Sequence, residues 1–446
     1  MKKVLFLIGG LLSSLAINAQ VLSNSDVAIL FSGEDNNGTA RYNAMGGAFG
    51  ALGGDLSAGD INPAGLAIFK NSSFSTSIGL RSTDINVNFS GTNTLNQDDY
   101  LNLTQGGGVL VFDGGRHSDI QKIAIGFNYS VSRDFENNWF TTGNSGFAPI
   151  TDFYDPDVIY GNTEEQTFEN FTTGRNDKFV FSFAAQTSEN LYIGASITTH
   201  SIDFYQSIFT EEFNNDGEGN TFDVSAHEEL ITFGTGVSFG VGFIAKPSNE
   251  LRLGVSFQSP TWYELSEEYV AFDDVLFFNG EPDIQRDIES INVFDYNLVT
   301  PAKLTGSLAY IVGKEGLISF DYTYKDFKNI KLKPAGEFND ENQNFANTLR
   351  GVSQFKVGAE WRLDKLSLRG GYHFEESPYA DAIDSDNISG YSLGVGLKFS
   401  GNTRLDFSYQ NSKNTDVYNF LNVDGVEPAN LDINNDRFTA TLVIGL

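Results

Sequence analysis

The sequence contains no cysteine, which excludes disulfide bonds and thiolate metal sites. Basic residues are scarce as well: 28 Lys and Arg stand against 58 Asp and Glu, for a formal net charge of -30. Because nucleic acids are bound by basic surfaces, this composition argues against a nucleic-acid partner. The four histidines lack the spacing of metal ligands. We therefore expect no metal, no cofactor and no enzymatic activity.

The apolar run at the N-terminus is short. It extends from Val4 to Leu15, which is too few residues for a membrane-spanning helix. Two lysines precede it and Ala19 follows it, an order that is typical of a secretory signal peptide. We expect residues 1–19 to be this signal peptide, cleaved after Ala19.

Glycine and aromatic residues, in contrast, are abundant, with 46 Gly, 39 Phe and 18 Tyr, and this favours strands and turns. Apolar and polar residues alternate in segments such as "KFVFSFAAQ" (178–186), "RLGVSFQ" (252–258) and "ISFDYTYK" (318–325). Period-two alternation is the signature of a strand with one apolar face. The polar face carries full charges, which suits a polar lumen better than the core of a soluble sandwich. We expect these charges to form a ladder of ion pairs: Lys356, Glu360, Arg369, Arg404 and Asp406.

The alternation predicts an all-β fold, a transmembrane antiparallel β-barrel of about fourteen strands in a bacterial outer membrane. The predicted strands lie near residues 72–89, 105–113, 120–134, 177–187, 190–206, 228–246, 250–262, 298–313, 316–327, 350–363, 365–375, 388–400, 402–412 and 436–446. Short turns alternate with long segments at 135–176, 207–227, 263–297, 328–349 and 413–435. Outer-membrane barrels have short periplasmic turns and long outer loops. Residues 72–446 are therefore predicted to form the barrel, with these long segments as its outer loops.

Much of the acidic excess falls in the predicted outer loops, at 163–170, 210–220 and 272–289. A solvated, charged exterior is the simplest interpretation. The stretch "NNDGEGN" (214–220) also has oxygen ligands and glycines, so a calcium-binding loop is an alternative, although no complete ligand pattern is present.

Residues 20–71 precede the first predicted strand and lack its alternation. Small residues and one Asn-Pro pair crowd the stretch "NAMGGAFGALGGDLSAGDINPAGLA" (43–67). No strand precedes the glycines, so a dinucleotide-binding loop is excluded. Small residues allow close backbone packing, and a wide barrel has room for such a segment. We expect residues 20–71 to form a plug, or hatch, with these gating residues: Gly46, Gly47, Gly53, Gly54, Asn62, Pro63, Ala64 and Gly65.

A glycine stripe marks the predicted strand 228–246. One face carries Ile231, Phe233 and Val237, and the other carries Gly234, Gly236, Gly240 and Gly242. Glycine in a strand often marks a close approach of another backbone or a ligand. We predict that these four glycines face the lumen and leave room for the plug or the substrate.

The stretch around Asn62, Pro63 and Ala64 resembles the N-terminal hatch of the FadL/OmpP1/TodX family of long-chain fatty acid transporters, which has an Asn-Pro-Ala motif. "TPAKLTGSLAYI" (300–311) resembles a second segment of that family. The amino-acid sequence of the hatch resembles that of the Bacteroidetes branch of the family. Some members of this branch are labelled haemin receptors or act in protein secretion. The resemblance implies a barrel with fourteen strands, a hydrophobic substrate and a side exit at a kink in the third strand.

The first three predicted strands carry hints of such a side exit. Apolar residues change from even to odd positions around Ser82, Thr83 and Asp84, and a β-bulge is the simplest cause. Further glycines, which weaken strand pairing, are Gly106, Gly107, Gly108 and Gly126. We predict a locally unpaired wall at these residues, gated by the plug. Ordinary barrel curvature is the alternative.

The sequence thus predicts a monomeric channel in outer-membrane lipid for hydrophobic small molecules such as long-chain fatty acids. Three alternatives remain open: a barrel partner in protein secretion or surface attachment, a haemin-receptor-like protein, and a general diffusion porin.

Overall fold

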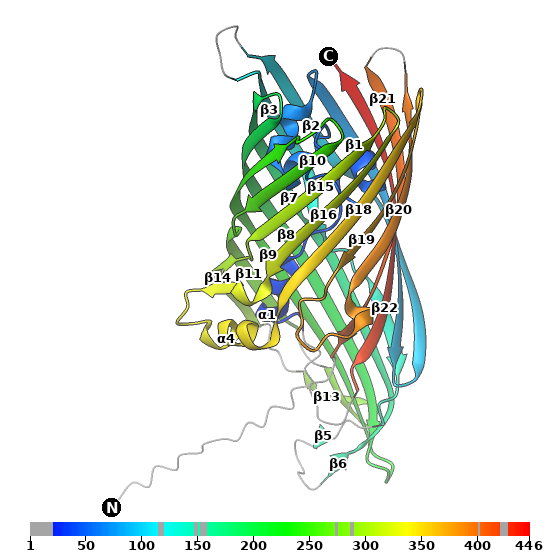
Figure 1. The fold of residues 1–446 in the computed structure, drawn as a ribbon. Coiled ribbons are helices and arrows are strands. Elements are labelled where there is room, and N and C mark those ends of the chain that lie inside the picture. The colour runs from blue at the N-terminus through cyan, green and yellow to red at the C-terminus, as the bar shows by residue number, and fades with distance from the viewer. Residues whose placement is uncertain are drawn as a thin grey trace, which may run out of the picture.

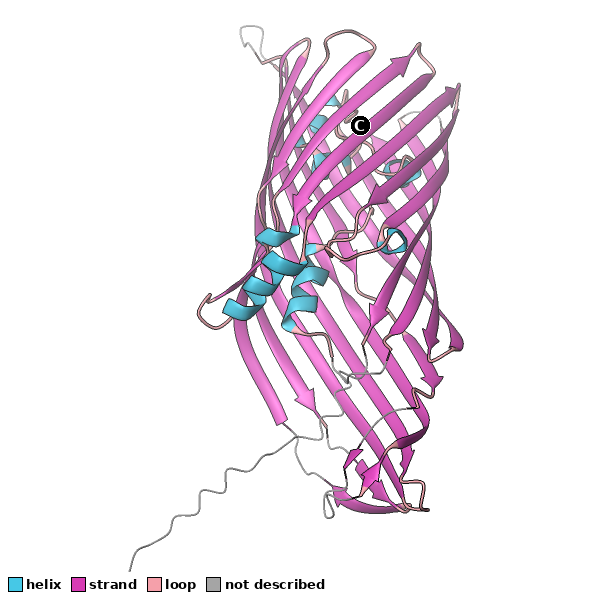
Figure 2. Cartoon of the chain, turned by 60° about the horizontal axis from the view of Figure 1, so that its bottom comes forward, coloured by secondary structure: helices cyan, strands magenta, loops and turns pink. Residues whose placement is uncertain are grey.

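The computed structural model describes residues 21–114, 120–146, 150–151, 158–272, 275–285, 290–399, 402–419 and 427–446. The predicted signal peptide, residues 1–19, lies outside the described residues. Strands dominate the chain, and a few short helices accompany them (Figure 2). In the part of the chain that the structure describes, no helix is long and apolar enough to cross a membrane.

The helical elements are α1 (Asn24–Ser32), α2 (Ala40–Ala44), α3 (Ala58–Ile61), α4 (Asn339–Thr348) and the 3-10 helices η1 (Pro63–Ile68), η2 (Phe327–Asn329) and η3 (Asp384–Asp386). The first strands are β1 (Ser73–Phe89), β2 (Thr92–Asp113), β3 (Lys122–Asp134), β4 (Trp139–Gly143), β5 (Ile150–Thr151), β6 (Ile159–Tyr160), β7 (Asn162–Ser188), β8 (Leu191–Asn215) and β9 (Thr221–Ala245). The next are β10 (Leu251–Gln258), β11 (Trp262–Ala271), β12 (Val275–Phe278), β13 (Glu281–Gln285), β14 (Ser290–Val299), β15 (Lys303–Val312), β16 (Gly316–Asp326) and β17 (Lys331–Lys333). The last are β18 (Gly351–Leu363), β19 (Leu366–Glu375), β20 (Ile388–Lys398), β21 (Thr403–Tyr418) and β22 (Ala429–Gly445).

The main sheet is antiparallel and closes on itself, because the last strand, β22, pairs with β1 along almost its whole length (Figure 1). Some wall strands consist of two elements. β10 and β11 both pair with β9, and on their other side they pair with β15 and β14. β4 likewise continues β3 along β7. With each such pair counted once, the wall has fourteen strands, which confirms the predicted barrel.

The two faces of the wall differ in polarity. On β16, Ile318 and Phe320 are exposed on the outer face, whereas Ser319 and Asp321 are buried on the inner face. Apolar side chains are exposed in the same way on the strands around it. A closed sheet satisfies every backbone group in lipid, and an apolar outer belt around a polar lumen is the arrangement of membrane-spanning barrels.

The predicted outer loops are wrong in several places, because strands continue through them. β8 and β9 leave only a turn at 216–220 within the predicted loop 207–227. β7 begins at Asn162, and β11 and β14 occupy much of 263–297. Beyond the lipid the outer face of a strand meets water, so hydrophobic alternation is lost there although the strand continues. The acidic residues of 163–170 and 210–215 accordingly lie on strands.

The stretch proposed as a calcium loop, 214–220, contains that turn. The Asp216 carboxylate accepts hydrogen bonds from the backbone amides of Glu218 and Asn220, at 2.8 and 3.0 Å. These bonds, together with one from the Asn220 side chain, hold the turn in shape from within.

The bulge predicted at Ser82, Thr83 and Asp84 is also wrong. The register of β1 with both β2 and β22 runs through these residues without a shift, and the irregularity lies between Ser77 and Ile78. Odd-numbered residues of β1 point inward at both ends of the strand. The apolar residues change face because the lumen above the lipid is itself apolar, in a cluster that includes the β1 residues Ile85, Val87 and Phe89.

Candidate functional site

Residues 21–72, here called the N-terminal segment, precede β1, and their helical elements lie inside the barrel (Figure 1). Its helical elements pack against opposite sides of the wall: α2 contacts β19 to β22, and η1 contacts β3 and β7 to β9. Every residue from Asn37 to Gly53 is buried. A stretch of small residues therefore packs deep in the lumen, where close approach to the wall is needed.

Two glycine pairs turn the segment sharply. Gly46 and Gly47 have φ values of 60° and 79°, and Gly53 and Gly54 have 59° and 67°, a region that side chains rarely tolerate. The second pair also contacts the start of η1, because the Gly54 amide donates to the Gly65 carbonyl at 3.1 Å. These predicted hatch residues thus shape the turns that fold the segment back on itself.

Asn62 connects this fold to the wall. Its Nδ2 donates to the carbonyl of Gly50 at 2.8 Å and to that of Phe243, on β9, at 3.1 Å. Its Oδ1 caps η1 by accepting from the Ala64 amide at 3.2 Å, and Pro63 occupies the first position of η1, where its missing N–H costs nothing. The Asn-Pro-Ala sequence is thus a helix start that is fixed to β9.

The wall receives the segment at glycines that lie on seven different strands. A Cβ added to any of them would lie within 2.6 Å of an atom of the segment, so a side chain there would force the segment to shift. These wall glycines are Gly126, Gly194, Gly242, Gly254, Gly358, Gly371 and Gly394. Sequence reasoning singled out Gly126 and Gly242 but missed the other five.

The rest of the predicted glycine stripe lies on the same inward side of β9. Gly240 faces the Ser196 side chain, and Gly236 faces the Tyr263 ring. Gly234 faces the backbone and side chain of β11. Gly242 is therefore the member of the stripe that packs against the N-terminal segment, at Asn62.

Buried ion pairs also fix the segment to the wall. Arg41, on α2, contacts Glu360 of β18 at 2.8 Å. Glu360 also pairs with Arg369 at 2.7 Å, and Arg369 pairs with Asp406 at 2.7 Å. Arg404 completes this ladder, whereas Lys356 contributes elsewhere, through a hydrogen bond to Asn36. The predicted ladder thus ends on a residue of the N-terminal segment that the sequence did not reveal.

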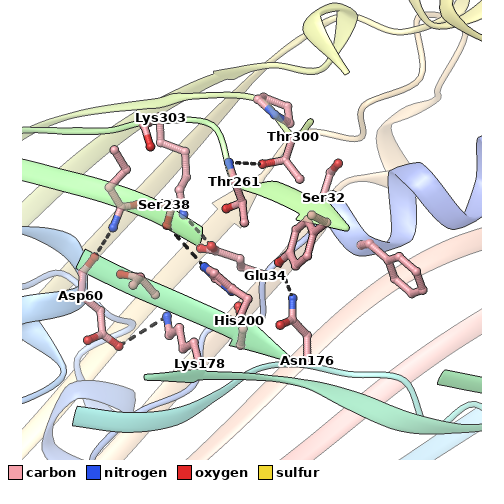
Figure 3. Close-up of a pocket in the computed structure, with 18 of the residues that line it drawn as sticks. Ser32, Glu34, Asp60, Asn176, Lys178, His200, Ser238, Thr261, Thr300 and Lys303 are labelled. Atoms are coloured by element: carbon pink, nitrogen blue, oxygen red, sulfur yellow. Dashed lines mark hydrogen bonds and ion pairs between the residues drawn. The ribbon is translucent and has the colours of Figure 1, made fainter. Parts of the chain in front are cut away.

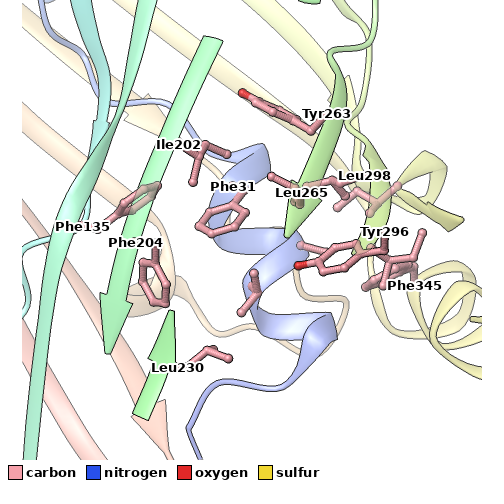
Figure 4. Packing of buried hydrophobic residues seen from close by; sticks show 14 of the residues in the cluster. Phe31, Phe135, Ile202, Phe204, Leu230, Tyr263, Leu265, Tyr296, Leu298 and Phe345 are labelled. Atoms are coloured by element: carbon pink, nitrogen blue, oxygen red, sulfur yellow. The ribbon is translucent and has the colours of Figure 1, made fainter. Parts of the chain in front are cut away.

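α1 fills an apolar space in the half of the barrel away from η1, here called the outer chamber (Figure 4). Val27, Ala28 and Phe31 of α1 are almost completely buried there. Phe31 packs against the rings of Phe135 and Phe204, with ring centroids 5.2 and 5.5 Å apart. The loop between β16 and β18 lines the chamber with these residues: Phe327, Ile330, Leu332, Phe345 and Leu349.

A polar cavity of about 30 Å³ adjoins the outer chamber (Figure 3). Lys303 Nζ contacts the Glu34 carboxylate at 2.6 Å, and Lys178 Nζ contacts that of Asp60 at 3.3 Å. Both carboxylates belong to the N-terminal segment, and both ammonium groups belong to the wall. Burial alone would raise the pKa of the Glu34 carboxyl, but Lys303 and Lys178 outweigh it and hold that pKa well below its usual value.

The wall is interrupted between β2 and β3. Their ladder runs from the Asp113/Lys122 pair to the Gln105/Ser130 pair. Beyond it, β2 stays paired with β1, while β3 follows β7 and bulges between Val131 and Arg133. A bulge bends its strand, so β3 diverges from β2 here. We call this interruption the β2–β3 gap.

The N-terminal segment bonds to the β3 edge at this gap. The Asp35 amide donates to the Ser132 carbonyl at 2.8 Å, and Asn37 Nδ2 donates to the Val131 carbonyl at 3.1 Å. Arg81, on β1, also reaches across to Asp134 at 3.1 Å. Side chains and the segment thus cover the place where the two wall strands separate.

The residues predicted to form an opening lie in paired parts of the wall. Gly106, Gly107 and Gly108 pair with both β1 and β3, and Gly126 pairs with both β2 and β7. The prediction of an unpaired wall at these glycines is wrong. The glycines are tolerated because the sheet holds their backbone, and Gly126 makes room for Leu66 of the segment.

No family model and no curated protein matches the sequence. Solved structures do resemble the barrel. A FadL homologue from Pseudomonas aeruginosa has a TM-score of 0.60, with 15% identity over 92% of this chain and 99% of that chain. This chain has the FadL-type fold. The toluene transporter TodX from P. putida has that fold too, with a TM-score of 0.56, 14% identity and coverage of 92% and 99%. The toluene transporter TbuX from Ralstonia pickettii has a TM-score of 0.52, with 16% identity over 91% of this chain and 98% of that chain.

Within this FadL-type fold, sequence reasoning missed the residues that join the segment to the wall. Glu34 and Lys303 are 269 positions apart, and each alone reads as an ordinary polar residue. The wall glycines did carry a signal, because each interrupts an otherwise regular strand pattern. The bulge at Ser132 has no comparable signal in the amino-acid sequence.

Proposed function

We propose that this chain belongs to the FadL family and is an outer-membrane channel for the uptake of hydrophobic compounds, with long-chain fatty acids as the first candidates. Residues 20–71 act as its plug, and the substrate leaves sideways through the β2–β3 gap into the membrane. The similar structures include transporters of toluene, which supports a hydrophobic substrate.

One observation carries this proposal: the ladder between two neighbouring wall strands ends at Gln105 and Ser130, and the N-terminal segment bonds to the edge that is left free. Apolar molecules gain about 0.8 kcal/mol for each methylene that leaves water for lipid. A side exit avoids the watery periplasm, so it suits such molecules better than an axial pore. The buried segment in the lumen also argues against a general diffusion porin.

Deletion of Ser132 tests the side exit. It removes the extra residue between the Val131/Asp177 and Arg133/Asn176 pairs, so β3 can run straight beside β2. We expect the uptake of radiolabelled oleate by cells to fall at least tenfold, with unchanged amounts of barrel in the outer membrane. Ser132→Ala keeps the bulge and is the matched control. Normal oleate uptake by the deletion variant would contradict the side exit.

A further inference from the structure

The wall of the polar cavity carries positive charge that the N-terminal segment neutralises. Lys303 and Lys178 project from β15 and β7, and their carboxylate partners, Glu34 and Asp60, both come from the segment. If the segment moved away, two ammonium groups would remain beside an apolar chamber. Such unpaired charges are costly away from water, so the site favours an anionic replacement.

Unpaired polar atoms line the same cavity. Ser132 Oγ, Asn176 Oδ1 and His200 Nδ1 are buried and have no hydrogen-bond partner among the described residues. All three residues border the cavity and are at least nine-tenths buried. Buried polar groups are nearly always satisfied, so these atoms indicate a place for a further polar group. The cavity of about 30 Å³ has room for about two waters, and a second carboxylate on Lys303 would need the place that Glu34 holds.

The cavity and the outer chamber are adjacent and share lining residues. Phe31 and Tyr263 border the polar cavity and also belong to the apolar cluster around α1. The chain from α1 to Glu34 therefore presents an apolar body in the chamber and one carboxylate on Lys303 (Figures 3 and 4). Asp26, the other carboxylate of this stretch, lies in the first turn of α1 and bonds to the N-cap residue Ser23. The part from Val27 to Glu34 thus has the chemical outline of an amphiphile with one carboxylate.

We propose that residues 24–34 are a built-in stand-in for the transported amphiphile: α1 occupies the place of its apolar chain, and the Glu34 carboxylate occupies the place of its head group on Lys303. This inference rests on the proposed function. An incoming carboxylate competes with Glu34, and its chain competes with α1. Because Asp35 and Asn37 hold the β3 edge, displacing Glu34 also pulls the next residues away from the β2–β3 gap. Filling the chamber thereby opens the exit.

Matched ligands test the competition. Dodecanoate and dodecanol share a chain but differ in charge, and their affinities are measured with the full-length protein in nanodiscs. We expect Glu34→Gln to tighten dodecanoate binding at least fivefold and to change dodecanol binding less than twofold. Lys303→Met should weaken dodecanoate alone, and the double variant should bind both ligands alike. Glu337→Gln, which removes an exposed carboxylate in an outer loop, is the control and should change neither affinity.

Equal effects of Glu34→Gln on both ligands, or no effect on either, would overturn the stand-in. Hydrogen exchange of the wild-type protein gives a second measurement that needs no variant. Dodecanoate should speed exchange at the Asp35 amide, which bonds to the Ser132 carbonyl, by at least tenfold, and the control ligand dodecanol should do so less. Unchanged exchange with bound dodecanoate would overturn the coupling to the gap.

The two proposals fail in different ways. If Glu34→Gln shifts dodecanoate binding but cells show no channel-dependent uptake of oleate, the stand-in holds and the transport function fails. If uptake requires the bulge at Ser132 but Glu34→Gln leaves dodecanoate binding unchanged, the transport function holds and the stand-in fails.

Discussion

Arg41 shows how a single charged side chain can fix a segment in a polar lumen. Its guanidinium is buried against Glu360, which two wall arginines, Arg362 and Arg369, also contact. The carboxylate therefore keeps partners if Arg41 is lost, and the wall itself stays intact. Removing Arg41 thus weakens the attachment of the N-terminal segment with little damage to the barrel.

We expect Arg41→Ala to cost the seated segment about 2 kcal/mol, the usual worth of hydrogen bonds to a charged group. Single-channel recordings in planar bilayers should then show openings that are at least tenfold more frequent than in the wild type. Arg362→Ala is the matched control, because Arg362 contacts the same carboxylate but its side chain is 49% exposed. Equal opening frequencies in the two variants would count against Arg41 as an anchor.

Among the elements, β3 sets the place of the proposed side exit. Its first part pairs with β2 through the glycines, and its last part, after the bulge, follows β7 alone. The exit is therefore expected beyond the Gln105/Ser130 pair and not at Gly126. A crosslink between two outward-facing residues in the paired part of β2 and β3 can distinguish these two locations.

Leu110 and Ile125 are opposite each other in the β2–β3 ladder, and both are exposed to the lipid. A disulfide between Leu110→Cys and Ile125→Cys, in a chain with no other cysteine, should leave oleate uptake within twofold of the reduced form, since it locks strands that are already paired. Uptake that stops on oxidation and returns on reduction would place the exit at the glycines instead.

Sequence reasoning succeeds for elements where lipid imposes a pattern. The strand predicted at 316–327 is β16, Gly316–Asp326, because its outer face must be apolar and its inner face polar. It fails at 207–227, where Glu211 and Glu212 follow each other on one strand beyond the lipid. Burial still alternates along β8 there, but apolar and polar residues no longer do. It fails again at Ser132, since a bulge depends on what the neighbouring strands do and not on the residue itself.

At the scale of the whole molecule, the barrel and its N-terminal segment fit each other through the wall glycines. These residues lie far apart in the sequence, and only the closed sheet brings them around one segment. The site is likewise composite, with Glu34 from the segment and Lys303 from the wall. The sequence therefore could not predict which residues contact each other, although it did indicate which types of residue are needed.

Gly254 tests this fit. A Cβ at Gly254 would lie 2.5 Å from the Gly50 carbonyl oxygen, and overpacking of this kind typically costs about 1–3 kcal/mol. We expect Gly254→Val to unseat the segment and speed its cleavage by added protease at least tenfold. Gly306→Val is the matched control on the neighbouring strand, because a Cβ there meets open space. Equal cleavage of the two variants would show that the glycine is not needed for seating.

The closure of β22 on β1 has a consequence for biogenesis. The N-terminal segment is the earliest described part of the chain to be synthesised, and β22 is the latest, yet the seam between β1 and β22 encloses that segment. Its anchors are distributed over strands from β3 to β22, so they come together only as those strands assemble. The strands from β3 to β22 therefore close around residues 21–72, and we expect docking of this segment to assist closure of the wall. A sequence change that delays this docking is expected to slow barrel maturation even when every strand is unaltered.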